Sequence, residues 1–190
     1  MNLMEIFAED CSYNDIEGMK RCMDKGADIN KNTLEGSSTH WARTPQALQL
    51  LLDNGAQVNT LDEFGLNAMM SQLQFYEIHH AWDSSPNIKL KYLTMLEIMV
   101  KTDVYINHQC KSGFTALMMA PDIEFAQILI ENGADPTITD NDGLMAFQHY
   151  RSSDNLATSA FLENAALKHK NVENSDLIGD ITTTNKKIRL

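Results

Sequence analysis

Two short motifs recur along this chain and keep the same distance from each other at every recurrence. The first is a Gly-Ala-Asp-like turn, whose last residues are Asn30, Asn59, Asn107 and Thr137. The second is a glycine six residues later, at Gly36, Gly65, Gly113 and Gly143. Both sets step by 29, then 48, then 30 residues. Two sets that stay in register across an irregular interval predict a repeated structural unit, with an insertion in the 48-residue step.

The most regular copy of this unit runs from Gly113 to Thr137. A short apolar segment, Thr115 to Ala120, is broken by Pro121-Asp122, and a second one, Ile123 to Glu131, ends at Asn132-Gly133. Because glycine readily adopts the left-handed conformation that ends a helix, the unit predicts two helices followed by an extended finger loop. One such unit cannot bury its own apolar face, whereas stacked neighbours can, so we expect an all-α solenoid.

These residues resemble the ankyrin repeat family. Gly113 to Leu117 matches the family's G-x-T-P-L, and Ile128 to Asp135 matches its L-L-L-x-x-G-A-D. The resemblance implies about five helix-turn-helix units, with approximate bounds 1–30, 31–59, 60–107, 108–137 and 138–168. The units are 29 or 30 residues long, against about 33 in the family, and T-P-L-H is altered in every one. The resemblance therefore implies a divergent array with compact helix pairs.

The third unit carries the insertion. The span from Gly65 to Asp103 is 38 residues, against 20 for the same span in the fourth unit. We expect the extra residues to lengthen the first helix through Tyr76 and to add a loop around Trp82 to Asn87. The array is expected to occupy residues 1–170, and the polar tail, 171–190, is expected to be partly disordered because it has few apolar residues.

Motifs of known catalytic or metal chemistry do not occur in the sequence. There is no G-x-S-x-G, no G-x-x-x-x-G-K, no H-E-x-x-H and no G-x-G-x-x-G. The adjacent pair His79-His80 would point about 100° apart on a helix and so makes a poor chelate. Asp140 to Gly143 lacks the rest of a calcium loop. We expect a protein that is not an enzyme and uses no cofactor or metal; an activity within the insertion is the less favoured alternative.

The charge and the cysteines narrow the class of partner and the compartment. The net charge of -11 disfavours nucleic acids and anionic membranes, which attract Lys and Arg patches, and favours a basic protein partner. An acidic surface without any partner is the simplest alternative. No run approaches the ~20 apolar residues of a membrane span.

Because the three cysteines lack paired spacing and the N-terminus lacks a secretory pattern, we expect a cytoplasmic protein, monomeric when free.

Candidate contact residues follow from the resemblance, which implies that partners dock on the concave face of finger tips and first helices. Leu34 and Phe64 are apolar at such tips, where exposed anchors with a charged rim are typical of interface hot spots. The alternative for both is packing against neighbouring fingers. Tyr105 stands where other units have Asp or Gln, and Trp82 lies in the insertion. The predicted partner-binding residues are Leu34, Glu35, Glu63, Phe64, Trp82, Tyr105 and Lys111.

The sequence as a whole predicts a protein–protein interaction module. A small acidic array of this kind resembles two kinds of bacterial protein, an immunity protein that covers the active site of a toxin and an effector or adaptor that engages host proteins. We favour the immunity protein, because acidity and small size suit tight binding of one cognate partner. A structural scaffold or homo-oligomer is the third hypothesis.

Overall fold

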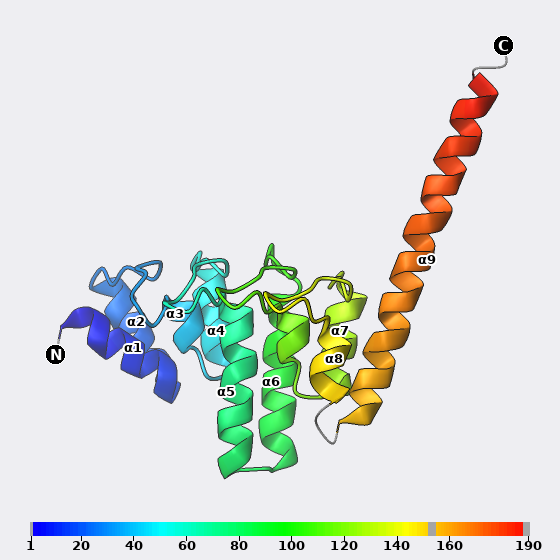
Figure 1. The fold of residues 1–190 in the computed structure, drawn as a ribbon. Helices are drawn as coiled ribbons and strands as arrows, with labels where there is room; N and C mark the ends of the chain where they lie inside the picture. Colours follow the sequence, from blue (N-terminus) through cyan, green and yellow to red (C-terminus); the bar gives the residue numbers. More distant parts are fainter. Residues whose placement is uncertain (1, 152–154, 188–190) are drawn as a thin grey trace.

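The fold was analysed in a computed structural model, which describes residues 2–151 and 155–187, with side chains described up to residue 172. These residues form helices and loops, with two isolated β-bridges and no strand, so the predicted all-α class is confirmed. The helices lie side by side in a row, and the loops that join one helix pair to the next gather along one edge of the row (Figure 1).

Each of the five predicted units contains one pair of helical elements. In chain order the pairs are α1 (Leu3–Tyr13) with α2 (Ile16–Asp24), α3 (Ser38–Trp41) with α4 (Pro45–Asp53), α5 (Ala68–Trp82) with α6 (Pro86–Met99), the 3-10 helix η1 (Ala116–Met119) with α7 (Ile123–Glu131), and α8 (Ala146–Arg151) with α9 (Leu156–Lys187). The finger loops are residues 25–37, 54–67, 100–115 and 132–145. The helical elements therefore follow the repeat pattern of the sequence.

Local signals in the sequence fix where the helices begin and end. The side chain of Thr44 accepts a hydrogen bond from the Ala47 N–H at the start of α4, and Pro45 opens that helix. Gly133 follows α7 with φ of +94°, and the next N–H, of Ala134, donates back to the Leu129 carbonyl at 2.9 Å. Caps of this kind keep the helices short and return the chain to the loop edge.

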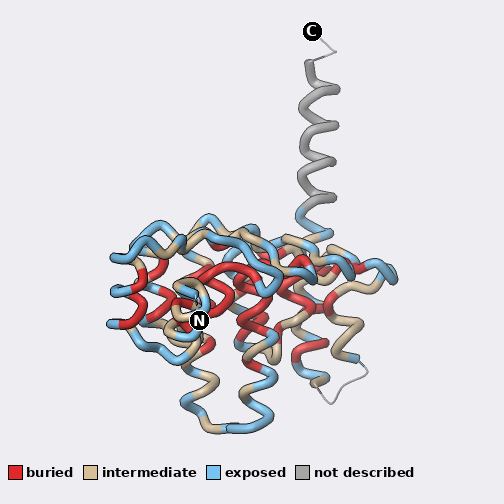
Figure 2. The backbone as a smooth tube through the Cα atoms, turned by 90° about the vertical axis from the view of Figure 1, so that its left-hand side faces the viewer, coloured by how far each residue is buried: buried red, intermediate tan, exposed pale blue. Residues whose placement is uncertain are grey.

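The core runs through the whole row of helices. Figure 2 shows the buried residues as a continuous band between the loop edge and the free ends of the helices. Large side chains that are fully buried include Phe7, Met19, Leu48, Leu51, Met69, Tyr92, Met95, Leu117, Phe125 and Leu129. Cys11, Cys22 and Trp41 are also buried, Trp41 being 6% exposed. Each unit thus buries its apolar face against its neighbours, which stabilises by about 1.5–3 kcal/mol per large side chain.

A series of asparagines joins each finger loop to the next; we call Asn30, Asn59 and Asn107 the asparagine ladder. Their Nδ2 groups donate to the carbonyls of Gly55, Asp103 and Gly133, at 3.1, 2.9 and 3.1 Å. Their Oδ1 atoms accept from the N–H groups of Gln57, Tyr105 and Asp135, at 2.8, 2.7 and 2.8 Å. Every step of the ladder therefore fixes two backbone groups of the following unit with one side chain.

The insertion is a helical hairpin. The predicted lengthening of the first helix is confirmed, since α5 has 15 residues. The predicted loop around Trp82 to Asn87 is wrong: α5 includes Trp82, α6 begins at Pro86 and has 14 residues, and only residues 83–85 lie between them. Asp83 accepts from the Ser85 N–H at 2.9 Å, and Pro86 suits a first helical position, so the turn is compact. Both helices project past their neighbours, away from the finger loops (Figures 1 and 2).

The last helix continues beyond the predicted array. The backbone of α9 is helical up to Lys187 and projects away from the row of helices (Figure 1). Residues 188–190 lie outside the described residues, as do all side chains after residue 172, so the predicted partial disorder of 171–190 stays a prediction. Within the described part of the chain, no helix is both long enough and apolar enough to cross a membrane.

We predict that Asn107→Ala lowers the free energy of unfolding by about 1–2 kcal/mol, because it removes one donor and one acceptor of the ladder. Thr137→Val is the matched control, since Thr137 stands at the same position of the next turn and bonds only within it, to Asp135 at 2.6 Å. Urea unfolding followed by circular dichroism measures both. Equal losses in the two variants would contradict a role for the ladder in joining units.

Candidate partner-binding site

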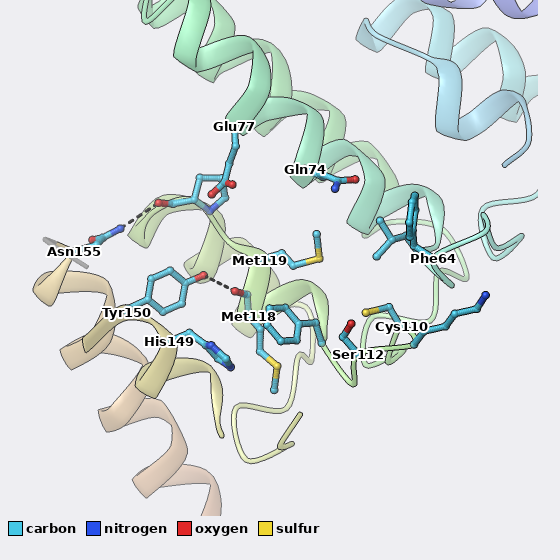
Figure 3. A pocket seen from close by; sticks show the side chains of 14 residues that line it. Phe64, Gln74, Glu77, Cys110, Ser112, Met118, Met119, His149, Tyr150 and Asn155 are labelled. Carbon is cyan, nitrogen blue, oxygen red and sulfur yellow. Dashed lines mark hydrogen bonds between the residues drawn. The ribbon is translucent and has the colours of Figure 1, made fainter. Parts of the chain in front are cut away.

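The candidate site is a hollow of about 690 Å³ on the face formed by the first elements of the last three pairs. Helix α5, the 3-10 helix η1 and helix α8 surround it, and two finger loops complete its rim (Figure 3). It is lined by Phe64, Leu66, Gln74, Glu77, Cys110, Lys111, Ser112, Phe114, Met118, Met119, Pro121, His149, Tyr150 and Asn155. The hollow therefore draws on three separate units of the chain.

The hollow exists because neighbouring first helices differ in length. Helix α5 has 15 residues, whereas η1 has four and stops at Ala120-Pro121. The later turns of α5 consequently extend beyond the end of η1. Met119 is half-buried in the space that is left, and its flexible thioether can adapt to the shape of a bound group.

One wall of the hollow is held in place by unit five. The Tyr150 hydroxyl on α8 donates toward the carbonyls at the end of η1, 2.5 Å from the oxygen of Ala120 and 3.1 Å from that of Met118. Asn155 donates to the Pro121 carbonyl at 3.1 Å (Figure 3). Burial, together with the negative charge of Glu77, raises the pKa of Tyr150, so the phenol keeps its proton and remains a donor.

The other wall is formed by His149 and Phe114, whose rings lie 4.8 Å apart between centroids. His149 Nε2 lies 2.8 Å from Oδ2 of Asp140, which orients the imidazole. The N–H of Leu144 donates to the Asp140 carboxylate, and together with that of Asp142 and the His149 ring it lowers the pKa of Asp140. The aspartate therefore stays charged and fixes both the finger turn and the histidine.

The rim carries both charge signs. Lys111 Nζ donates to the Glu63 carbonyl at 2.6 Å, so this ammonium is held across two finger tips. Glu77 is exposed on α5, and its carboxylate has no ion pair within the described part of the chain. The hollow thus combines apolar side chains, such as Phe114 and Met119, with polar groups and a carboxylate at its edge. Among the residues whose side chains are described, no three His, Cys, Asp or Glu groups lie together as metal ligands would.

The finger-tip residues of the predicted set lie at or beside the hollow. Phe64 and Lys111 line it, Glu63 is exposed next to Phe64 on the same finger, and Leu34 and Glu35 are exposed on the preceding finger. Leu34 is 73% exposed and Phe64 is 61% exposed, so neither is packed away against the next finger, which was the alternative. Their role in binding stays a prediction.

Two predicted contact residues lie elsewhere. Trp82 is 89% exposed at the end of α5, and the length of that helix separates it from the finger loops (Figure 1). Tyr105 is 66% exposed in a turn of the asparagine ladder and does not line the hollow. The structure therefore does not bring the seven predicted residues together on one surface, because the insertion is a hairpin directed away from the fingers.

Sequence reasoning missed Glu77, Phe114, Met119 and Tyr150. The T-P-L-H departures at Thr115 to Met118 marked the region of η1 as a candidate for function, but that stretch contains none of these four residues. Glu77 and Tyr150 gave no local signal, since they belong to different units and meet only when the units stack. Their positions in the sequence do not indicate that they line the same hollow, because they lie on different helices.

Known proteins do not add to this description of the site. No protein-family model matches the chain, and a search of curated proteins found no significant match. The geometry of the hollow and the repeat motifs are therefore the features that point to a function.

We predict that Tyr150→Phe lowers the free energy of unfolding by about 1–2 kcal/mol, because the carbonyls at the end of η1 lose a donor inside a buried contact. The control is Tyr13→Phe, which removes a hydroxyl from a side chain that is 82% exposed and should change little. Thermal unfolding of both variants measures the difference. An unchanged midpoint for Tyr150→Phe would show that this wall does not depend on the hydroxyl.

Proposed function

We propose that this chain is a divergent ankyrin-type array that binds a partner protein at the hollow beside its finger tips. The observation that carries the proposal is Phe64, an aromatic side chain that is 61% exposed at the rim of an apolar hollow. Aromatic anchors beside a pocket are typical of the centre of an interface. The repeat motifs and the stacked helix pairs support the ankyrin-type architecture.

In the proposed complex, an apolar side chain of the partner enters the hollow and contacts Phe114 and Met119, while Phe64 covers it from the rim. A hollow of about 690 Å³ lies within the usual size range of ligand sites. The asparagine ladder and the bonds of Tyr150 hold the surrounding backbone before binding. Little conformational entropy is then lost on association, which favours affinity.

The carboxylates at and beside the rim favour a basic group on the partner. Glu77 offers an unpaired carboxylate next to the hollow, and Glu35 and Glu63 add negative charge on the finger tips. A partner segment that presents an apolar residue beside a Lys or Arg would satisfy both the hollow and Glu77. The net charge of -11 would also speed the encounter with a basic protein.

A toxin-like protein whose active site is covered in the complex is the partner that this charge favours, which makes the chain an immunity protein. An effector or adaptor acting on a host protein would use the same hollow with a different partner. A homo-oligomer is less favoured, because the net charge of -11 makes two copies of the chain repel each other. We therefore place the immunity function first.

The test is co-expression with the product of the adjacent gene, followed by purification and calorimetry. We expect a stable complex, protection of cells from that product, and a Kd that rises about 10- to 100-fold in Phe64→Ala, since truncation of an anchor costs about 1–3 kcal/mol. Leu90→Ala is the matched control, because Leu90 is 63% exposed on α6 and does not line the hollow.

Two results would count against the proposal in different ways. Absence of both a complex and protection would exclude the immunity function with this partner. A complex that Leu90→Ala weakens as much as Phe64→Ala does would place the interface away from the hollow.

A further inference from the structure

A second cluster of chemistry-bearing side chains lies on the other flank of the α5–α6 hairpin, beside α3 and α4. The guanidinium carbon of Arg43 lies 3.5 Å from the centroid of the Phe75 ring. Lys91 Nζ lies 4.6 Å from the centroid of the Tyr92 ring, and His79 Nδ1 lies 2.5 Å from the Tyr92 hydroxyl. None of these residues lines the hollow at the finger tips. We call Arg43, His79 and Lys91 the cation cluster.

The cation cluster has no carboxylate partner. Neither Arg43 nor Lys91 makes an ion pair within the described residues, although the chain has 26 Asp and Glu against 15 Lys and Arg. The hydrogen bonds of Arg43 go to the carbonyls of His40 and Ala42, at 2.5 and 3.1 Å, which fixes the guanidinium in place. In so acidic a chain, two half-buried cations without a counter-ion leave room for an anion from outside.

The pKa shifts of these groups agree with positive charges that no nearby carboxylate balances. Burial lowers the pKa of Arg43 from 12.5 to about 10. Burial and then Arg43 lower the pKa of Lys91, and burial, Lys91 and Arg43 lower the pKa of His79. The other titratable groups that interact with Arg43 are His40, whose pKa burial lowers, and Tyr92 and Cys11, whose pKa values burial raises to about 12. None of them supplies negative charge at neutral pH.

We propose that Arg43, Lys91 and His79 form a binding site for an oxyanion, either a phosphate group or a carboxylate. Arg43 offers the remaining N–H donors of a planar guanidinium held over Phe75, and Lys91 offers an ammonium from the neighbouring helix. His79 is bonded to the hydroxyl of Tyr92, the ring over whose face the Lys91 ammonium lies. The site lies on a different surface from the hollow and does not depend on the proposed partner.

The test follows the pKa of His79 by NMR in the full chain, with the resonance assigned by comparison with His79→Gln. Inorganic phosphate and acetate are titrated separately, with sodium chloride at matched ionic strength as the reference. We expect at least one of the two oxyanions to raise the pKa of His79 in a saturable way, because a bound anion stabilises the imidazolium. Saturation by acetate assigns a carboxylate, and saturation by phosphate alone assigns a phosphate group.

Lys91→Met is the informative variant, since it removes one charge and keeps most of the apolar stem. We expect it to raise the pKa of His79 in the absence of oxyanion and to weaken oxyanion binding about tenfold or more, as loss of a charge-assisted hydrogen bond predicts. Lys101→Met, at an exposed lysine after α6, is the control and should bind as the unmodified chain does. Equal effects of both oxyanions and chloride, or equal binding by Lys91→Met, would overturn the proposal.

Discussion

The asparagine ladder is the contact on which the regularity of this structure depends. A pair that joins a four-residue element to a nine-residue helix, as α3 with α4 or η1 with α7, has only a narrow apolar face, so it is stable only against a neighbour at a defined distance. The side chain of Asn107 sets that distance, because it bonds both a carbonyl and an N–H of the next turn. Adjacent fingers also pack closely at their tips. A Cβ added to Gly113 would lie 2.5 Å from the backbone nitrogen of Asn141, so only glycine fits at this position.

Both candidate sites arise where the long α5–α6 hairpin meets shorter neighbours. On one flank, the later turns of α5 extend beyond the four-residue η1, and the apolar hollow forms there. On the other flank, the four-residue α3 ends at Trp41, and Arg43 follows it against Phe75 of the hairpin. An insertion that lengthens one pair in a row of short pairs therefore creates two unlike surfaces, one apolar with a carboxylate and one cationic.

Features with a local physical cause could be predicted from the sequence. The turn ending at Asn107 and the break at Pro121 each follow from residues within a few positions, and each agrees with the structure. The connection after Trp82 was predicted wrongly, because only the local composition was considered. Polar residues 83–87 are typical of a loop, yet Pro86 serves as the first residue of a helix that packs against α5.

The all-α class and the repeat register follow from the sequence alone, because helix caps, glycines and apolar periodicity act over one or two turns of chain. The exposure of Phe64 was left open between a free finger tip and packing against the next finger, and the fold settles it. Which side chains share a surface likewise depends on the tertiary structure. Glu77 and Tyr150 line one hollow, and Arg43 and Lys91 share one flank, through the relative lengths and stacking of separate helices. Those distances depend on how units far apart in sequence pack, and no local pattern records them.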